Sequence, residues 1–229
     1  MNIAGIQPLS LIDYPGRPCS IIFTQGCIFR CSYCHNPDLI PLEAQESARA
    51  VPDVLSFLEE RKDVVDAVCI TGGEPTIQQG IIEFIATLKN LGISVKLDTN
   101  GIRPDIVEQL ISARLVDYVA MDLKATWAKY RDVVRAGTDA TVEACKRTFE
   151  LIQDSDIDHE FRTTVMPGVH RAEDFIEMAG YLKNGERYFF QKTSRTKTLE
   201  SLPVSDSIDI MVVVGDLSRI FPSLSLAVR

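Results

Sequence analysis

The sequence predicts an α/β fold, a partial (β/α)6 barrel of parallel strands with the helices outside. Six short β-rich runs alternate with helical stretches, and the loops between them are short. This alternation is typical of a parallel sheet covered by helices. Right-handed crossovers curl such a sheet into a barrel or leave it doubly wound. Six units are fewer than the eight of a closed barrel, which favours a partial barrel.

The strands are predicted from compact runs of apolar and β-branched residues. They cover residues 19–24, 66–71, 94–98, 117–123, 160–166 and 187–191. The turn pair Asn100-Gly101 follows the third strand. A further edge strand is expected at 224–228, and the N-terminal segment through Gly16 is expected to pack near the loop after the first strand.

The helices are predicted where apolar residues recur at positions i, i+3, i+4 and i+7. Pro104 fits the first turn of the third helix. A loop is expected over 192–203 and a last helix over 207–217. The five stripes between the strands are Val51, Val54, Leu55 and Leu58; Ile81, Phe84, Ile85 and Leu88; Val107, Leu110 and Ile111; Val142, Cys145, Phe149 and Ile152; and Phe175, Met178, Ala179 and Leu182.

Length and composition predict a single domain over 1–229, with a core at about 17–192 and a helix and strand extension at 193–229. The 229 residues are 45% hydrophobic, enough for one sizeable core. No apolar run reaches the ~18 residues of a membrane span. Residues 1–10 do not resemble a signal peptide, and six cysteines without one favour a reducing, cytoplasmic location.

The net charge of −8 argues against nucleic acid as a partner, because phosphate binding needs clustered Lys and Arg. One basic cluster, Lys192, Arg195 and Lys197, could meet an acidic partner or a phosphate, although a solvated loop explains it as well.

Three cysteines, Cys27, Cys31 and Cys34, follow the first strand with the spacing C-x3-C-x2-C. A structural zinc site needs four ligands, usually two pairs from different parts of the chain. A [4Fe–4S] cluster is held by cysteine thiolates. Three thiolates in one tight loop therefore favour such a cluster with one iron left open.

Other interpretations of the cysteines stay open. His35 could complete a Cys3His zinc site, although it directly follows Cys34. Cys19, Cys69 and Cys145 could lend a distant ligand, although buried cysteines often act as small apolar residues. The three cysteines could also be incidental.

Polar motifs follow the other predicted strands at their C-terminal ends, where ligands gather in parallel α/β folds. The second strand ends in 71–75, TGGEP, the third in 97–101, LDTNG, and the fourth in 121–124, MDLK. Arg162 lies in the fifth strand and Gln191 at the end of the sixth. We therefore expect one site built from all six strands.

The segment 25–37, QGCIFRCSYCHNP, resembles the signature of radical SAM enzymes, with Tyr33 where they keep an aromatic residue before the third cysteine. A closer resemblance is to the activases of glycyl radical enzymes. Residues 5–8, GIQP, and 10–16, SLIDYPG, are similar to anaerobic ribonucleoside-triphosphate reductase activating proteins. The resemblance extends to about Gln191, and it too implies a partial barrel.

The resemblance implies that Gly72, Gly73 and Glu74 receive the methionine amino group of S-adenosylmethionine. Two glycines leave backbone groups open to close approach by a ligand. An ordinary strand-to-helix turn is the alternative. Arg162 needs a carboxylate partner, from the protein or the cofactor, because Arg is rarely buried unpaired. Gln191 stands where some activases keep a polar ligand for the adenosine.

Asp98, Thr99 and Asp122 could bind a small monovalent cation beside the methionine carboxylate, since oxygen ligands suit hard cations. Alternatively, Asp98 bonds its own turn. Asp122 and Lys124 share a face of a regular strand, and the resemblance makes them ligands of the ribose or carboxylate. A solvent-exposed ion pair is the alternative.

The implied activity is radical generation. An electron from a donor such as flavodoxin or ferredoxin reduces the cluster and cleaves S-adenosylmethionine to a 5′-deoxyadenosyl radical. In an activase this radical takes a hydrogen atom from a glycine of a partner enzyme. The cofactors supply the chemistry and the protein supplies binding and orientation.

Anaerobic ribonucleotide reductase is the partner we expect. A pyruvate formate-lyase type of activase is the alternative, although those often show Asp-Gly-Pro-Gly where this chain has Asp13-Tyr14-Pro15-Gly16. A radical SAM enzyme acting on a small molecule, and a non-catalytic zinc module, are the remaining hypotheses.

Overall fold

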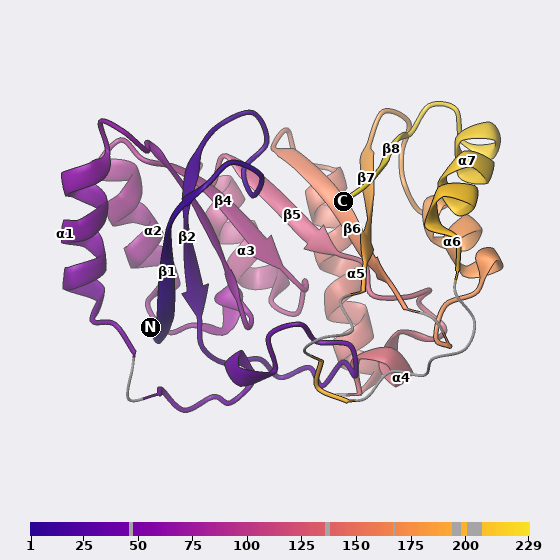
Figure 1. Cartoon of the computed structure of the whole chain (residues 1–229), viewed down its shortest axis with the longest axis horizontal. Helices are drawn as coiled ribbons and strands as arrows, with labels where there is room; N and C mark the ends of the chain where they lie inside the picture. Colours follow the sequence, from indigo (N-terminus) through magenta and orange to yellow (C-terminus); the bar gives the residue numbers. More distant parts are fainter. Residues whose placement is uncertain (46–47, 136–137, 167, 194–197, 201–207) are drawn as a thin grey trace.

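The computed structural model describes residues 1–45, 48–135, 138–166, 168–193, 198–200 and 208–229. Their strands form one eight-stranded sheet in the order β1 to β8, without closure between its two edges (Figure 1). The seven strands from β2 onward pair in parallel, and β1 pairs antiparallel with β2. The strands are β1 (Ile3–Ser10), β2 (Cys19–Thr24), β3 (Ala67–Gly72), β4 (Ser94–Thr99), β5 (Tyr118–Asp122), β6 (Asp158–Val165), β7 (Arg187–Lys192) and β8 (Ser225–Val228).

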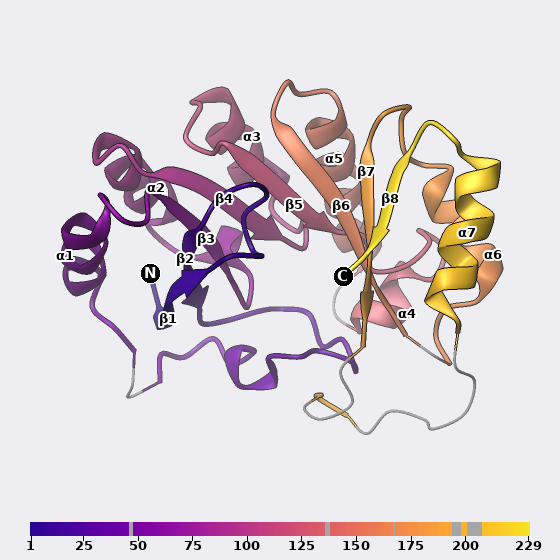
Figure 2. The same cartoon turned by 45° about the horizontal axis from the view of Figure 1, so that its top comes forward.

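The helices form an arc along the outer side of the curved sheet (Figure 2). The α-helices are α1 (Val51–Arg61), α2 (Ile81–Asn90), α3 (Pro104–Ser112), α4 (Tyr130–Val134), α5 (Asp139–Gln153), α6 (Ala172–Ala179) and α7 (Ile210–Ile220). Two 3-10 turns, η1 (Pro37–Leu39) and η2 (Pro75–Ile77), follow β2 and β3. None of the helices in the described ranges is long and apolar enough to cross a membrane.

The predicted architecture is confirmed: β2 to β7 are the six predicted parallel strands, and the helices between them lie outside. The edge strand expected at 224–228 is β8, which pairs with β7. The last helix begins at Ile210 instead of residue 207, which is outside the described residues. Arg195, Lys197 and part of the predicted loop over 192–203 also lie outside them.

The N-terminal segment contains an additional strand, β1, which was not predicted from the sequence. Ile3 lies opposite Thr24, next to the cysteine loop as expected, whereas Ser10 lies opposite Cys19 at the far end of β2. Residues 11–18 therefore join β1 to β2 beyond the N-terminal end of β2, although Asp13 among them reaches the interior and lines the cavity described below. The single domain and its boundaries at 17–192 and 193–229 stay a prediction, although β1 and β8 both extend the same sheet.

The two faces of the sheet differ in chemistry because side chains alternate along each strand. Outward residues, such as Val95, Leu97 and Phe161, join the main apolar core beneath the helices. The inner face carries a smaller apolar cluster that includes Cys69 and Tyr118. The same face holds buried charged side chains, namely Lys96, Asp98, Glu160 and Arg162.

Candidate active site

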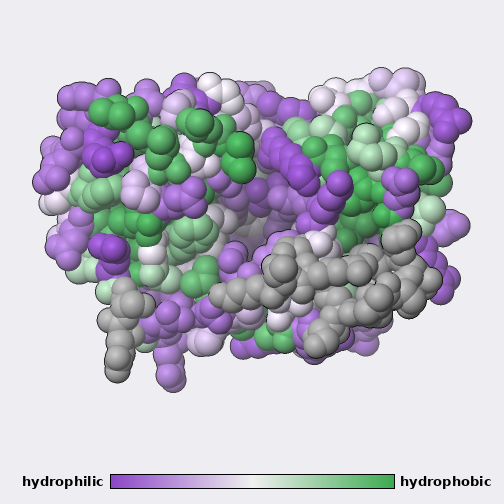
Figure 3. Space-filling model, viewed as in Figure 1, coloured by the Kyte–Doolittle hydropathy of each residue, from purple (hydrophilic) through white to green (hydrophobic). Residues whose placement is uncertain are grey.

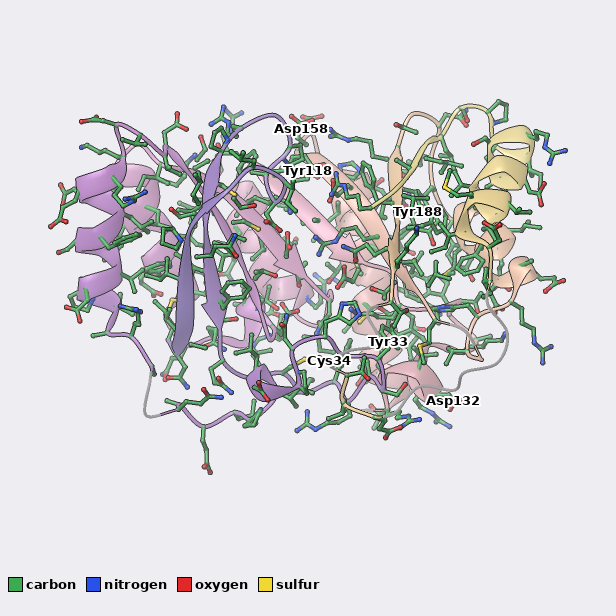
Figure 4. All side chains as sticks on the ribbon, in the orientation of Figure 1. Tyr33, Cys34, Tyr118, Asp132, Asp158 and Tyr188 are labelled. Carbon is green, nitrogen blue, oxygen red and sulfur yellow. The ribbon has the colours of Figure 1, made fainter. Side chains whose placement is uncertain are left out.

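A cavity of about 250 Å³ lies at the C-terminal ends of the strands. The hollow at the centre of the surface in Figure 3 is bordered by hydrophilic residues. Figure 4 shows Tyr33 and Cys34, on the cysteine loop, at the same end of the sheet as the cavity. Tyr118 and Asp158 lie at the opposite end.

All thirteen residues predicted for the site line this cavity: Cys27, Cys31, Tyr33, Cys34, Gly72, Gly73, Glu74, Asp98, Thr99, Asp122, Lys124, Arg162 and Gln191. Their individual roles stay predictions. The other lining residues are Asp13, Phe29, His35, Asn36, Thr71, Asn100 and Thr164, of which the sequence suggested a ligand role for His35 alone, in the zinc alternative.

The cysteine loop is held by its backbone. Gly26 N donates to Leu39 O at 2.8 Å and Cys27 N to Ile40 O at 3.0 Å. Further along, Arg30 N donates to Val134 O at 2.8 Å. The path of the loop is therefore set by η1 and the end of α4 as well as by the cysteines.

The three thiols suit an iron–sulfur cluster. Burial raises the pKa of Cys27 to about 12 and that of Cys31 to about 11. As free thiols they are neutral, so binding iron releases protons. Among the described residues the buried Tyr33 hydroxyl has no hydrogen-bond partner, which leaves a polar group at this wall of the cavity for a ligand to use.

The zinc alternative gains no support. Within the described part of the chain, no three His, Cys, Asp or Glu side chains converge closely enough to hold one metal ion. A four-iron cluster does not need that convergence, because each thiolate binds a different iron. Cys19, Cys69 and Cys145 are buried free thiols that do not line the cavity.

Gly72 and Gly73 are required by the protein's own backbone. A Cβ on Gly72, whose φ is +114°, would lie 2.5 Å from Thr24 N. A Cβ on Gly73 would lie 2.2 Å from Gly26 O. Gly73 N donates to Thr24 O at 2.9 Å and Glu74 N to Gly26 O at 2.8 Å. The glycines thus let β3 approach the start of the cysteine loop, whereas the sequence analysis attributed them to approach by a ligand.

The Glu74 side chain joins neighbouring loops. It is 1% exposed, and burial raises its pKa. Its Oε1 accepts from Thr76 Oγ1 at 2.6 Å and from Thr99 Oγ1 at 2.7 Å, and Oε2 accepts from Asn100 N at 2.7 Å. Both oxygens are therefore bonded within the protein, which makes Glu74 a positioning residue between β3 and β4.

Five charged side chains form a continuous chain across the cavity wall, which we call the charge chain. Asp98 contacts Lys96 through Oδ1 at 2.7 Å and Arg162 through Oδ2 at 2.9 Å. Asp122 contacts Arg162 through Oδ1 at 3.0 Å and Lys124 through Oδ2 at 2.7 Å. Each carboxylate oxygen therefore lies beside a cation of the protein, although Asp98 Oδ1 accepts no hydrogen bond within the described part of the chain.

The charge chain fixes the ionisation of its members. Although burial opposes ionisation, Arg162 and Lys96 lower the pKa of Asp98 to about 2. Burial also opposes the ionisation of Asp122, but Lys124 and Arg162 together lower the pKa of this carboxyl. Arg162 was expected to have a carboxylate partner, and it has two in the protein, Asp98 and Asp122. Lys124 is not the solvent-exposed half of an ion pair, because its side chain is only 16% exposed and lines the cavity.

The small cation stays a prediction. Asp98 and Asp122 lie beside cations of the protein and the Thr99 hydroxyl donates to Glu74, whereas Asp98 Oδ1 is buried without a hydrogen-bond partner among the described residues. Asp98 also does not bond its own turn, the other expectation. Gln191 on β7 also lines the cavity, and its Oε1 accepts from Thr164 Oγ1 on β6 at 3.4 Å.

Replacing Gly73 with alanine tests the packing of the cysteine loop. The added Cβ would overlap Gly26 and Leu39 backbone atoms, so we expect the free energy of unfolding to fall by about 1–3 kcal/mol. Cluster content should fall as well. Gly215→Ala is the control, because its Cβ meets nothing within 4 Å and alanine favours the α7 helix. Urea unfolding and iron analysis would measure both effects. A Gly73→Ala variant with wild-type stability and cluster content would contradict the close packing of Gly73 against Gly26.

The family follows from a comparison with family models. The model described as the radical SAM superfamily matches residues 21–182. The chain belongs to the radical SAM superfamily. It accordingly uses a [4Fe–4S] cluster and S-adenosylmethionine.

Two relatives define its place within the superfamily. A Methanocaldococcus jannaschii protein, named as a candidate glycyl-radical enzyme activating enzyme, is 35% identical over 193 residues, 83% of this chain and 79% of the relative. A pyruvate formate-lyase-activating enzyme of Streptococcus mutans is 30% identical over 202 residues, 81% of this chain and 74% of the relative. The chain belongs to the family of glycyl-radical enzyme activating enzymes.

Solved structures share the fold. Streptococcus suis SuiB bound to S-adenosylmethionine has a TM-score of 0.67 at 18% identity, over 90% of this chain and 48% of SuiB. The native anSMEcpe with bound AdoMet has a TM-score of 0.60 at 16% identity, over 90% of this chain and 61% of that protein. The chain thus spans about half the length of SuiB, and at these identities the likeness concerns the fold alone.

Proposed function

We propose that this radical SAM enzyme abstracts a hydrogen atom from a glycine of a partner glycyl radical enzyme, and that the partner is an anaerobic ribonucleotide reductase. The observation that carries the proposal is one cavity lined by all thirteen predicted residues. The N-terminal motifs GIQP and SLIDYPG favour the reductase as partner.

Cys27, Cys31 and Cys34 would hold the cluster, and S-adenosylmethionine would occupy the adjoining cavity. When bound, these cofactors supply the electron transfer and the 5′-deoxyadenosyl radical. The protein's own residues orient them. Lys124 and Arg162 are the two cations of the charge chain that line the cavity, and either could pair with a bound carboxylate. Phe29 and Tyr33 form an apolar and aromatic part of the wall and exclude water from it.

A pyruvate formate-lyase type of partner is the second candidate. The relative from Streptococcus mutans carries that name and is similar over 81% of this chain. Action on a small molecule is the third hypothesis. We also propose a flavodoxin or ferredoxin as electron donor and a cytoplasmic location, in keeping with six free cysteines.

The test is anaerobic activation in vitro. The reconstituted protein is mixed with dithionite, S-adenosylmethionine and either an anaerobic ribonucleotide reductase or a pyruvate formate-lyase. We expect a glycyl radical signal by electron paramagnetic resonance with the reductase, and 5′-deoxyadenosine in proportion to it. A reductase whose radical glycine is changed to alanine is the control.

The outcomes separate the hypotheses. A radical only with pyruvate formate-lyase would favour the second candidate. Formation of 5′-deoxyadenosine with a small nucleoside, and never with a glycyl radical enzyme, would contradict the activase proposal.

A further inference from the structure

The turn after β4 brings an amide side chain to the first cysteine of the cysteine loop. Asn100 is 5% exposed and lines the cavity. Its Nδ2 donates a hydrogen bond to Cys27 Sγ, and the two atoms are 3.7 Å apart. Cys27 is one of the three proposed ligands of the cluster. The amide N–H of Asn100 therefore points at a sulfur that would bind iron.

The orientation of this amide is fixed by its oxygen. Asn100 Oδ1 accepts from Ile102 N at 3.1 Å, two residues further along the turn. An Asn amide has an acceptor on one side and two N–H donors on the other. The bond to Ile102 therefore turns Nδ2 toward Cys27. The opposite orientation would place two donors against each other at Ile102 and an oxygen against the sulfur.

The main chain of the same turn is held by two other parts of the fold. Asn100 N donates to Glu74 Oε2 at 2.7 Å, from the loop after β3. On α5, Cys145 Sγ donates to Asn100 O at 3.4 Å, and Thr148 Oγ1 donates to Gly101 O at 2.6 Å. The amide is therefore held beside the cysteine loop by contacts that do not involve the cysteines of that loop.

We propose that Asn100 is a positioning residue that raises the reduction potential of the cluster through its hydrogen bond to Cys27 Sγ. Hydrogen bonds to the sulfurs and net charge set the potentials of iron–sulfur clusters. Reduction adds one electron, and a hydrogen bond is stronger when its acceptor carries more negative charge. The bond therefore stabilises the reduced cluster more than the oxidised one. The inference rests on the proposed function in one respect, that Cys27 is a ligand of the cluster.

The charges around the cavity explain why such a donor is useful. Among the described residues, four carboxyl side chains line the cavity against two side chains of Lys or Arg. The carboxyl groups belong to Asp13, Glu74, Asp98 and Asp122, and the cations are Lys124 and Arg162. Negative charge near a cluster opposes the addition of an electron. The amide of Asn100 offsets part of this repulsion and adds no net charge of its own.

The test is the midpoint potential of the cluster in anaerobically reconstituted protein. It is measured by electron paramagnetic resonance during a titration with dithionite, without S-adenosylmethionine. Asn100→Leu removes the donor to Cys27 and keeps most of the volume. We expect the equilibrium constant for one-electron reduction to fall about tenfold, which lowers the potential by about 59 mV.

Asn100→Asp is the second variant. It keeps an oxygen that accepts from Ile102 N, so the turn retains this bond. At Cys27 it replaces the donor with a carboxylate, which repels added negative charge. Its potential should therefore fall further than that of Asn100→Leu.

Thr148→Val is the matched control. It removes the buried hydroxyl that donates to Gly101 O, but it leaves the amide of Asn100 beside Cys27. Asn100→Leu and Thr148→Val both remove a hydrogen bond of the same turn, so an effect of the turn alone would shift both potentials. We expect Thr148→Val to keep the wild-type potential.

An Asn100→Leu variant that holds a cluster at the wild-type potential would overturn the proposal, and so would an equal shift in Thr148→Val. If Asn100→Leu holds no cluster, the potential of Asn100→Asp decides. Loss of the cluster from both variants would make Asn100 a structural residue of the turn, which also overturns the proposal. The potentials need no partner enzyme, so a failed activation assay leaves them unaffected. A wild type without a cluster would instead contradict the assignment of Cys27 as a ligand.

Discussion

Replacing Cys31 with alanine is expected to abolish the iron–sulfur cluster and the cleavage of S-adenosylmethionine. Cys31 is one of three thiols in the loop after β2, and a cluster held by two thiolates lacks a ligand on a second iron. Iron and acid-labile sulfide should fall to about a tenth or less of the wild-type content. Absorbance, metal analysis and 5′-deoxyadenosine formation would measure the loss in anaerobically reconstituted protein.

Cys19→Ala is the matched control for this variant. Cys19 is also a buried free thiol, but it lies at the start of β2 and does not line the cavity. It should keep the cluster and the activity. Loss of the cluster in Cys19→Ala, or its retention in Cys31→Ala, would contradict the assignment of the three ligands. A colourless wild type that binds zinc would favour the zinc module.

Replacing Arg162 with methionine should produce the largest loss of stability. Arg162 joins Asp98 to Asp122, and its removal leaves one oxygen of the buried Asp98 and one of the partly buried Asp122 without a cation. Breaking a buried ion pair by removing one partner costs about 3–5 kcal/mol. Urea unfolding at pH 7 would measure this loss. Arg147→Met is the control, because Arg147 pairs with Glu108 at the surface and should change the stability by less than about 1 kcal/mol.

The loss should depend on pH with a definite sign. In the wild type the pKa of Asp98 is about 2, below its ordinary value of 3.8. Its ionised form therefore stabilises the fold above pH 3.8, and this contribution disappears as the pH falls through about 2. In Arg162→Met the carboxylates lose that cation and their pKa values rise. The difference in the free energy of unfolding between the variant and the wild type should then be largest at neutral pH and shrink as the pH falls toward 4. A difference that does not change with pH would contradict this.

The sequence predicted most strands well because their signal is local. The run CSIIFT at β2 is a short, nearly continuous β-rich segment, and such a segment signals a buried strand by itself. In β1, Gly5 and Pro8 interrupt the pattern, and most of its side chains are partly or fully exposed. Its strand character comes from antiparallel pairing with β2, with irregular register, which no local pattern carries. The helix α4 was missed because five residues give too short a periodic signal.

The sequence also predicted where the site residues gather, but not how they pair. The rule that ligands lie at strand ends brought Gly72, Asp98 and Asp122 together correctly. It said nothing of Lys96, although its position two residues before Asp98 placed both on one face. The partners of Glu74 depend on the tertiary approach of two loops, and Asp13 reaches the cavity from the loop between β1 and β2. Spacing alone does not determine such contacts.

The anchoring of the cysteine loop has a consequence for the life of the enzyme in the presence of oxygen. Gly26 and Cys27 are tied to residues 39 and 40, and Glu74 is tied to Gly26, entirely through peptide groups. Unlike a zinc finger, which is unfolded without its metal, this loop keeps its shape from bonds that oxidation does not touch. Loss of iron during exposure to air would thus leave these backbone contacts in place, and repair would require iron, sulfide and a reductant for the oxidised cysteine thiols.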